Sequence, residues 1–322
     1  MRLVFCGTPA FAVPTLHALL AVGHTVELVL TQPDRASGRG LAQQFSAIKQ
    51  AALERNLPIA QPEKIRNNAA LQQQLTDIAA DAIVVVAYGR LIPPWMLTLP
   101  RHGNLNLHAS LLPKYRGAAP IQWAIARGES ETGVTTMRID EGLDTGDMLL
   151  QQRVPIGPEQ TAAELAPVLA EAGAALMVQT LAALGRGTLT ATPQQNSLAT
   201  LAPILQREDG HIDTARTATE IYNRWRGFQP WPGAYGILRE KKLTIHNMRI
   251  ERMRIESMGI ESEALQPSLP SGILHVQGHR LFLACGETTL LELLEVQIEG
   301  RKRIAAEDFL HGYALAPGER LA

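Results

Sequence analysis

The 322-residue sequence predicts an α/β domain built on an open, doubly wound and mostly parallel sheet, followed by a smaller, mainly β domain. Short apolar runs alternate with amphipathic stretches through the first half of the chain, and several of these runs are continuously apolar, as strands buried on both faces require. Strand-length segments with glycine-bearing turns fill the second half. The length itself favours about two domains.

The first domain starts with a β-α-β-α order. Its expected elements are strands at 2–6 and 25–31 and helices at 12–22 and about 45–56. Pro14 falls in the first turn of the first helix, and Gly23 stands where a left-handed C-terminal cap is expected. The run Ile83 to Ala87 fits a parallel strand that is buried on both faces.

A polar stretch separates the two predicted domains. A helix over 162–184 ends before Gly185 and Gly187, and the residues that follow are rich in Thr and Gln and flanked by prolines. We therefore expect a first domain at 1–187, a linker at 188–207 and a second domain at 208–322. The second domain should contain a short helix at 220–225, a long polar loop at 251–271, and strands of a barrel or open barrel at 243–250, 272–276, 281–284 and 289–298.

Composition excludes several classes of protein. With 46% hydrophobic and 19% charged residues, the chain is far from the composition of disordered proteins. Its 30 basic and 31 acidic residues give no global attraction for a polyanion, so any contact with nucleic acid must be local. The apolar runs have the length of strands, and the N-terminus lacks the long apolar core of a signal peptide.

From these features we expect a cytoplasmic protein without a transmembrane segment. The two cysteines, Cys6 and Cys285, are expected to be buried free thiols. Nothing in the sequence resembles a long coiled-coil seam, and a monomer is expected.

The segment Gly103 to His108 (GNLNLH) alternates polar and apolar residues, so Asn104, Asn106 and His108 share one face if it is a strand. Ligands of open α/β sheets bind beyond the carboxyl ends of the strands, where this strand would present an amide and an imidazole together. A half-exposed edge strand is the alternative interpretation of the same pattern.

An acidic loop, Asp140 to Asp147 (DEGLDTGD), places four carboxylates in eight residues. Such loops are usually solvated turns and sometimes cation sites. Combined with Asn106 and His108, however, a carboxylate completes a set that contains an oxyanion donor, a group that titrates near neutrality and a partner that orients or charges it. This set favours acyl or one-carbon transfer.

Other enzyme classes lack their motifs. The first turn (FCGTPAF) has a single glycine where a dinucleotide-binding fingerprint has G-x-G-x-x-G. The histidines form no H-E-x-x-H pair, and the Ser110 region has no G-x-S-x-G elbow. A nicotinamide or flavin enzyme, a zinc hydrolase and the usual serine hydrolase are therefore unsupported.

Three segments together resemble the folate-dependent formyltransferases: Asn106-Leu-His108, SLLPKYRGAAPIQWAI from Ser110, and ETGVTTMRIDEGLDTGD from Glu131. The segments FCGTPAFAVPTL, TQPDRASGRG, VVVAYGRLIP and FQPWPGAY are similar to those of the members that act on methionyl initiator tRNA. The resemblance extends over about residues 1–315 and so covers both domains and the linker.

The resemblance implies a Rossmann-like N-terminal domain that binds 10-formyltetrahydrofolate and an OB-like, open-barrel C-terminal domain that helps to hold tRNA. The implied activity is transfer of the formyl group to the α-amine of methionyl initiator tRNA, with no metal. By position, the implied catalytic residues are Asn106, His108 and Asp144. The implied folate pocket consists of Tyr88, Arg90, Leu91, Ile92, Ser110, Leu111, Leu112, Pro113 and Asp140. The implied tRNA contacts are Arg35, Arg39 and Arg207.

The chain departs from the family where lysines are common. Residues 41–48 contain none before Lys49, and the linker offers only Arg207. We therefore expect tRNA binding with a shallow salt dependence. These departures keep open a formyltransferase that acts on an amino sugar nucleotide, as well as a catalytically silent folate- or RNA-binding protein.

Overall fold

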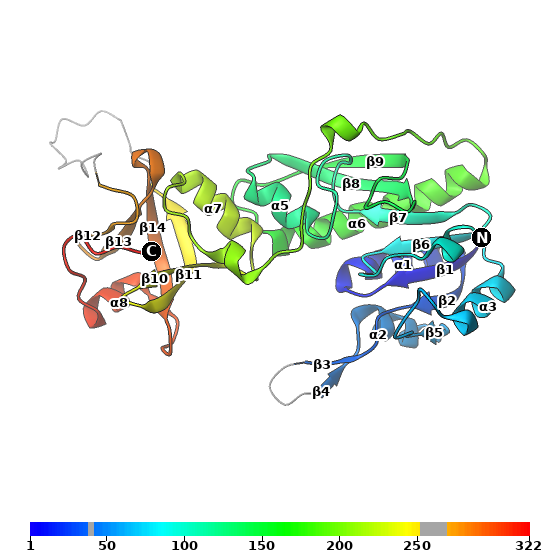
Figure 1. Cartoon of the computed structure of the whole chain (residues 1–322), viewed down its shortest axis with the longest axis horizontal. Helices are drawn as coiled ribbons and strands as arrows, with labels where there is room; N and C mark the ends of the chain where they lie inside the picture. The colour runs from blue at the N-terminus through cyan, green and yellow to red at the C-terminus, as the bar shows by residue number, and fades with distance from the viewer. Residues whose placement is uncertain (38–41, 252–268) are drawn as a thin grey trace. The chain divides into compact units, whose positions relative to one another are not determined.

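The computed structural model describes residues 1–37, 42–251 and 269–322. The chain forms two compact units (Figure 1). The N-terminal unit contains residues 1–121, 130–157 and 164–204, and the C-terminal unit contains residues 122–129, 158–163 and 205–322. Each unit is described by itself below.

The N-terminal unit is built on a seven-stranded sheet of order β5-β2-β1-β6-β7-β8-β9. The first five strands in this order are parallel, and β8 and β9 are antiparallel to their neighbours. The strands are β1 (Arg2–Gly7), β2 (Thr25–Leu30), β5 (Ile59–Ala60), β6 (Ala82–Val86), β7 (Asn104–His108), β8 (Glu131–Arg138) and β9 (Met148–Pro155). The predicted doubly wound, mostly parallel sheet is confirmed. Strand β7 lies between β6 and β8, so the alternative of an edge strand is wrong.

Helices cover both faces of this sheet. Apolar side chains of β1, β2 and β6 pack on one face against Leu71 and Leu75 of α3 and Met96 of α4. On the other face, Leu107 of β7 lies against α6, where a Cβ on Gly173 would come within 2.5 Å of the leucine side chain. The helices are α1 (Val13–Ala21), α2 (Ala47–Glu54), α3 (Ala69–Ile78), α4 (Pro94–Leu97) and α6 (Ala162–Gly185), with 3-10 turns η1 (Ala10–Ala12) and η2 (Asn196–Leu198). Helix α5 (Pro120–Ala126) contributes residues to both units.

Local sequence signals explain where the early helices begin and end. Pro14 lies in the first turn of α1, and Gly23 after it has a φ of 84°. Helix α2 begins later than predicted because Ser46 is its N-cap, with Oγ accepting a hydrogen bond from the Lys49 amide at 3.1 Å. The short strands β3 (Arg35–Ser37) and β4 (Ala42–Gln44) precede α2 as an antiparallel pair.

The predicted linker differs from the structure, because residues 188–204 belong to the N-terminal unit. Within it, residues 192–202 cross from β9 to the loop after β7, and we call them the crossing segment. At one end, Thr192 and Met148 exchange backbone hydrogen bonds; at the other, Arg116 exchanges them with Thr200 and Ala202. These backbone contacts order a stretch whose polar composition is typical of a linker.

The C-terminal unit contains a six-stranded antiparallel sheet of order β10-β11-β14-β13-β12, with β15 paired to β14. Its core joins the inner side chains of the sheet to Ile221 of α7 and Phe309 of α8. The strands are β10 (Ala234–Leu238), β11 (Lys241–Ile250), β12 (Leu274–Gln277), β13 (Arg280–Ala284), β14 (Leu290–Ile298) and β15 (Ile304–Ala305). The helices are α7 (Ala218–Gly227) and α8 (Ala306–Gly312), with η3 (Arg207–Gly210) and η4 (Gly286–Thr288). The predicted mainly β second domain is confirmed.

Two further features concern burial. Both cysteines are buried free thiols, as predicted. Among the described helices, α6 has the length and composition to cross a membrane, and half of its most apolar 18-residue window is buried in the structure. Leu165, Leu169 and Met177 of α6 are fully buried, as in the core helices of soluble proteins, which pass the same test of length and composition.

Candidate active site

The alternation of β7 places two candidate side chains on the same face of the sheet. Asn104, Asn106 and His108 face the side covered by α3 and α4, where Asn104 Nδ2 donates to the Met96 carbonyl at 2.9 Å. His108, at the carboxyl end of the strand, is 5% exposed. Asn106 is half-buried, and its side chain forms no hydrogen bond with the rest of the described chain. Its amide is therefore available to a ligand.

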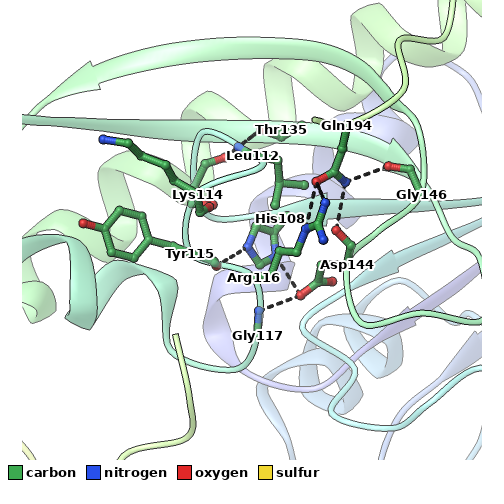
Figure 2. A network of polar contacts seen from close by, with 11 residues as sticks. His108, Leu112, Lys114, Tyr115, Arg116, Gly117, Thr135, Asp144, Gly146 and Gln194 are labelled. Carbon is green, nitrogen blue, oxygen red and sulfur yellow. Dashed lines mark hydrogen bonds and ion pairs between the residues drawn. The ribbon is translucent and has the colours of Figure 1, made fainter. Parts of the chain in front are cut away.

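The imidazole of His108 lies between two acceptors (Figure 2). Nε2 is 2.9 Å from the Tyr115 carbonyl oxygen, which can only accept, so Nε2 carries the proton of this hydrogen bond. Nδ1 is 3.6 Å from Asp144 Oδ2, which is too long for a direct hydrogen bond. A proton on Nδ1 would face Asp144 without a direct hydrogen bond to it, so this N–H is available to an oxygen of a ligand.

The carboxylate of Asp144 is held by backbone geometry. Its side chain is 18% exposed, and Oδ2 accepts a hydrogen bond from the Gly117 amide at 2.9 Å. Asp144 has a φ of 51°, in the left-handed region that Asp tolerates better than most residues. The loop also needs Gly146, since a Cβ there would lie 2.0 Å from the Arg138 carbonyl oxygen. His108 and Asp144 are therefore brought together by a constrained loop.

The same loop contains Asp140, which the resemblance implies as a residue of the folate pocket. The Asp140 side chain is exposed and accepts hydrogen bonds from the Gly142 amide and the Thr145 hydroxyl at 2.8–3.0 Å. These hydrogen bonds within the loop stabilise the turn at residues 140–145. The aliphatic side chain of Leu143, in contrast, is 55% exposed.

The segment after β7 is anchored to the antiparallel strands. Thr135 Oγ1 donates to the Ser110 carbonyl and accepts from the Leu112 amide, and Gln151 Nε2 donates to the Leu112 carbonyl. Ser110 and Leu112 are buried, while Leu111 and Pro113 are half-buried. The predicted pocket residues 110–113 thus form a fixed wall next to His108.

The segment 88–92 is divided between core and surface. The Tyr88 ring is buried in the core, and burial raises the pKa of its hydroxyl to about 12. Thr8 and Gln32 donate to the Tyr88 carbonyl at 3.1 and 3.0 Å. Arg90 donates from Nη1 to the Glu63 carbonyl. Leu91 is 81% exposed, whereas Ile92 is half-buried and packs against the core.

The backbone of this segment is also available. Leu91 and the half-buried Ile92 form no backbone hydrogen bonds with other described residues. Their N–H and C=O groups can therefore bind a ligand that presents donors and acceptors along one edge.

The predicted tRNA contacts lie in different parts of the sequence. Arg35 begins β3, Arg39 lies outside the described residues, and Arg207 is exposed at the start of η3. Lys49, the first lysine after the first loop, forms an ion pair with Asp34 and lies over the Phe45 ring. Lys49 is thus engaged within the protein.

The sequence did not single out Gln194 or Arg116. The Arg116 side chain is 7% exposed and donates to Gln194 Oε1 at 2.8 and 3.0 Å. Gln194 Nε2 donates in turn to the carbonyls of Asp144 and Gly146 at 2.8 and 2.7 Å (Figure 2). No local sequence signal marks Gln194, because it lies 50 residues from Asp144 in a polar, linker-like stretch.

Among the described residues, one group of side chains elsewhere has the donor set of a metal site. The ligand atoms of His279, Glu307 and His311 lie within 4.8 Å of one another in the C-terminal unit. All three side chains are exposed, and none belongs to the candidate active site.

Family models match both parts of the chain. The model described as formyl transferase matches residues 1–181, and the model described as formyl transferase, C-terminal domain, matches residues 204–314.

Full-length relatives are similar throughout. The methionyl-tRNA formyltransferase of Acidobacterium capsulatum is 61% identical over 321 residues, which cover 100% of this chain and 99% of the relative. The methionyl-tRNA formyltransferase of Koribacter versatilis is 56% identical over 100% of this chain and 98% of the relative.

A solved structure shares the fold at low identity. The N-formyltransferase from Helicobacter canadensis, in complex with folinic acid and dTDP-3-aminofucose, superposes with a TM-score of 0.64 and 18% identity, over 91% of this chain and 98% of that protein. The family models and the full-length relatives lead to one conclusion: this chain belongs to the formyl transferase family, in the group that contains the methionyl-tRNA formyltransferases.

Proposed function

We propose that this protein transfers the formyl group of 10-formyltetrahydrofolate to the α-amine of methionyl initiator tRNA. The observation that carries the proposal is the arrangement of an unpaired Asn106 amide and the His108–Asp144 pair at the end of β7, among the residues that the structure describes. Identity of 61% over the whole chain with a methionyl-tRNA formyltransferase supports the tRNA as acceptor.

The reaction requires stabilisation of an oxyanion. The amine nitrogen forms a bond to the formyl carbon, the bond from that carbon to folate N10 breaks, and N10 takes up the proton that the amine loses. Negative charge develops on the formyl oxygen in the tetrahedral intermediate. Asn106 donates its amide N–H and His108 its Nδ1–H to this oxygen. Asp144 stabilises the imidazolium and helps to move the proton of the amine.

The folate pocket is proposed between the segments 88–92, 110–113 and 140–144. The backbone groups of Leu91 and Ile92, which pair with no other described residue, fit the polar edge of a pterin ring. The exposed side chains of Leu91 and Leu143 fit its apolar faces. Tyr88 contributes through its backbone, because its ring lies in the core.

The roles of the two domains are also part of the proposal. Residues 1–187, with the crossing segment packed on them, bind folate and carry out the transfer, and residues 208–322 bind tRNA. Arg35, Arg39 and Arg207 contact its phosphates. The protein acts without a metal, as a monomer, in the cytoplasm.

The test measures formyl transfer from 10-formyltetrahydrofolate by the purified protein. One reaction contains methionyl initiator tRNA, a second contains methionyl elongator tRNA, and a third contains a 4-amino sugar nucleotide. Formylation of the initiator tRNA alone is expected.

The other outcomes are equally informative. Formylation of the sugar nucleotide alone would overturn the acceptor while keeping Asn106, His108 and Asp144 in their roles. Absence of transfer to any of the three, with folate still bound, would favour a catalytically silent binding protein.

A further inference from the structure

The two neighbours of His108 lie on separate loops, and both loops adopt unfavourable backbone conformations. Tyr115, whose carbonyl accepts from Nε2, has a φ of 64°, and Asp144, whose carboxylate faces Nδ1, has a φ of 51°. A non-glycine residue in the left-handed region costs on the order of 1–3 kcal/mol and persists only where surrounding contacts hold it. The contacts that hold these two residues are therefore relevant to the geometry of the site.

The crossing segment supplies contacts to both loops. For the Tyr115 loop, Thr200 Oγ1 accepts from the Tyr115 amide at 2.9 Å, and the backbone of Thr200 and Ala202 pairs with Arg116. For the Asp144 loop, the contact is made by the side chain of Gln194. A single segment of the chain thus reaches the neighbours of both ring nitrogens of His108.

The amide of Gln194 has one possible orientation. The Arg116 guanidinium has only donors, so it fixes Oε1 on its side. The carbonyls of Asp144 and Gly146 have only acceptors, so they fix Nε2 on the other. Arg116 is buried, pairs with no carboxylate among the described residues, and is further held by Asn196 Oδ1 at 2.9 Å. This arrangement makes Gln194 a rigid brace on the carbonyl of Asp144.

We infer that Gln194 is a positioning residue for the reaction, which holds Asp144 in its left-handed conformation and so keeps the carboxylate directed at His108. The inference rests on the proposed function. Without the two hydrogen bonds from Nε2, residue 144 relaxes toward a more favourable backbone conformation, and its carboxylate moves away from Nδ1. Misplacement of a reacting group by about 1 Å can cost on the order of 10²-fold in rate.

The test compares Gln194→Met with Gln195→Met in the formyl transfer assay with methionyl initiator tRNA. Gln195 is the adjacent residue of the same type, but it is exposed and its side chain has no hydrogen bond to another described residue. Gln194→Met should lower kcat about tenfold and change KM for the tRNA by less than about twofold. Gln195→Met should match the wild type. A kcat of Gln194→Met within about twofold of the wild type would overturn the inference.

A double-mutant cycle distinguishes positioning from a general structural role. If Gln194 acts through the Asp144 carboxylate, Gln194→Met should have little effect on kcat in a protein that already carries Asp144→Asn. The same loss in both backgrounds would mean that Gln194 acts independently of Asp144, and it would reject the proposed role.

Gln194→Glu is a second variant that tests the same hydrogen bonds if Gln194→Met does not fold. Its carboxylate still accepts from Arg116, but it cannot donate to the carbonyls of Asp144 and Gly146. It places a carboxylate oxygen beside two carbonyl oxygens, so kcat should fall, and a thermal midpoint above the assay temperature shows that the loss is not caused by unfolding. Normal kcat in Gln194→Glu would show that the two donated bonds are dispensable. A wild-type protein that formylates no acceptor would instead remove the proposed function, on which the inference depends.

Discussion

The His108–Asp144 pair of the N-terminal unit and the arginine–carboxylate pairs of the C-terminal unit use charged residues in different ways. In the N-terminal unit, the Asp144 carboxylate takes its hydrogen bond from a backbone amide, and the nearest basic group, His108, is 3.6 Å away. In the C-terminal unit, five of the described arginines are paired directly with carboxylates. These pairs are Arg249 and Arg280 with Glu292, Arg239 with Glu319, Arg303 with Glu295, and Arg216 with Asp213.

The charges of the His108–Asp144 pair can take part in a reaction, whereas the charges of the arginine–carboxylate pairs are neutralised within the fold. An imidazole and a carboxylate that form no direct hydrogen bond with each other can respond to a charge that develops on a substrate. Arginines held by carboxylates are less available to the phosphates of a nucleic acid. We therefore expect the largest functional effects at the end of β7 and small effects, mainly on stability, from the ion pairs of the C-terminal sheet.

The largest effect is expected from the residues that face the oxyanion. Asn106→Ala and His108→Ala should each lower kcat by about 10²- to 10³-fold, which is typical of the loss of one oxyanion donor. The measurement is steady-state formyl transfer to methionyl initiator tRNA at saturating folate.

Matched controls are available nearby. Asn67 is exposed, and the His102 side chain forms no hydrogen bond with the described chain, so Asn67→Ala and His102→Ala should retain wild-type kcat. Near-normal turnover in both Asn106→Ala and His108→Ala would contradict the assignment of the site.

A smaller effect, on stability, is expected at Gly117, whose amide donates to the Asp144 carboxylate. Gly117 has a φ of 121°, and a Cβ there would lie 2.7 Å from the Ala202 carbonyl oxygen. Gly117→Ala should lower the free energy of unfolding by about 2–3 kcal/mol, through backbone strain and displacement of the crossing segment. Chemical denaturation measures this change.

The control for that variant separates strain from steric contact. Gly187 also has a positive φ, 68°, but a Cβ at this position would have no described atom within 4 Å beyond its chain neighbours. Gly187→Ala should therefore cost only about 1 kcal/mol, from the backbone conformation alone. Equal losses in the two variants would mean that the close approach at Ala202 contributes nothing.

The sequence predicts the sheet and the catalytic candidates because their signals are local. Alternation in Asn104 to His108 gives the shared face, and the glycines of the acidic loop indicate a tight turn. The roles of Gln194 and Tyr88 could not be predicted in this way. Gln194 contacts Asp144 across 50 residues of sequence, which leaves no periodic pattern. Tyr88 belongs to a motif in which its own ring enters the core while the Leu91 side chain is exposed.

The ion pairs of the C-terminal sheet should affect stability rather than turnover. Glu292 has a 6% exposed side chain and accepts hydrogen bonds from Arg249 and Arg280, and these bonds, with Arg280 dominant, lower the pKa of its carboxyl. Glu292→Gln should lower the free energy of unfolding at pH 7 by about 1–2 kcal/mol and leave kcat unchanged.

The pH dependence gives the sign of this contribution. Because the folded pKa of Glu292 is lowered, its stabilisation is present above the pKa of the unfolded chain and is lost as the pH falls through the folded pKa. The difference in stability between the wild type and Glu292→Gln should therefore shrink below about pH 4. Urea denaturation at about pH 7 and about pH 3.5 measures it, and a difference that stays constant would exclude the ionised carboxylate as its source.

The smallest effect is expected from a single phosphate contact. Arg207 is exposed and pairs with no carboxylate among the described residues, and it helps to lower the pKa of Lys242, for which burial is the larger cause. If Arg207 contacts tRNA, Arg207→Ala should weaken binding a few-fold and reduce the slope of log K against log salt by about 1. Arg303→Ala is the matched control, because Arg303 is engaged by Glu295, and its slope should equal that of the wild type. Since five described arginines of this unit are paired with carboxylates, the wild-type slope itself should be shallower than about −5, and a steeper value would mean that tRNA breaks these pairs on binding.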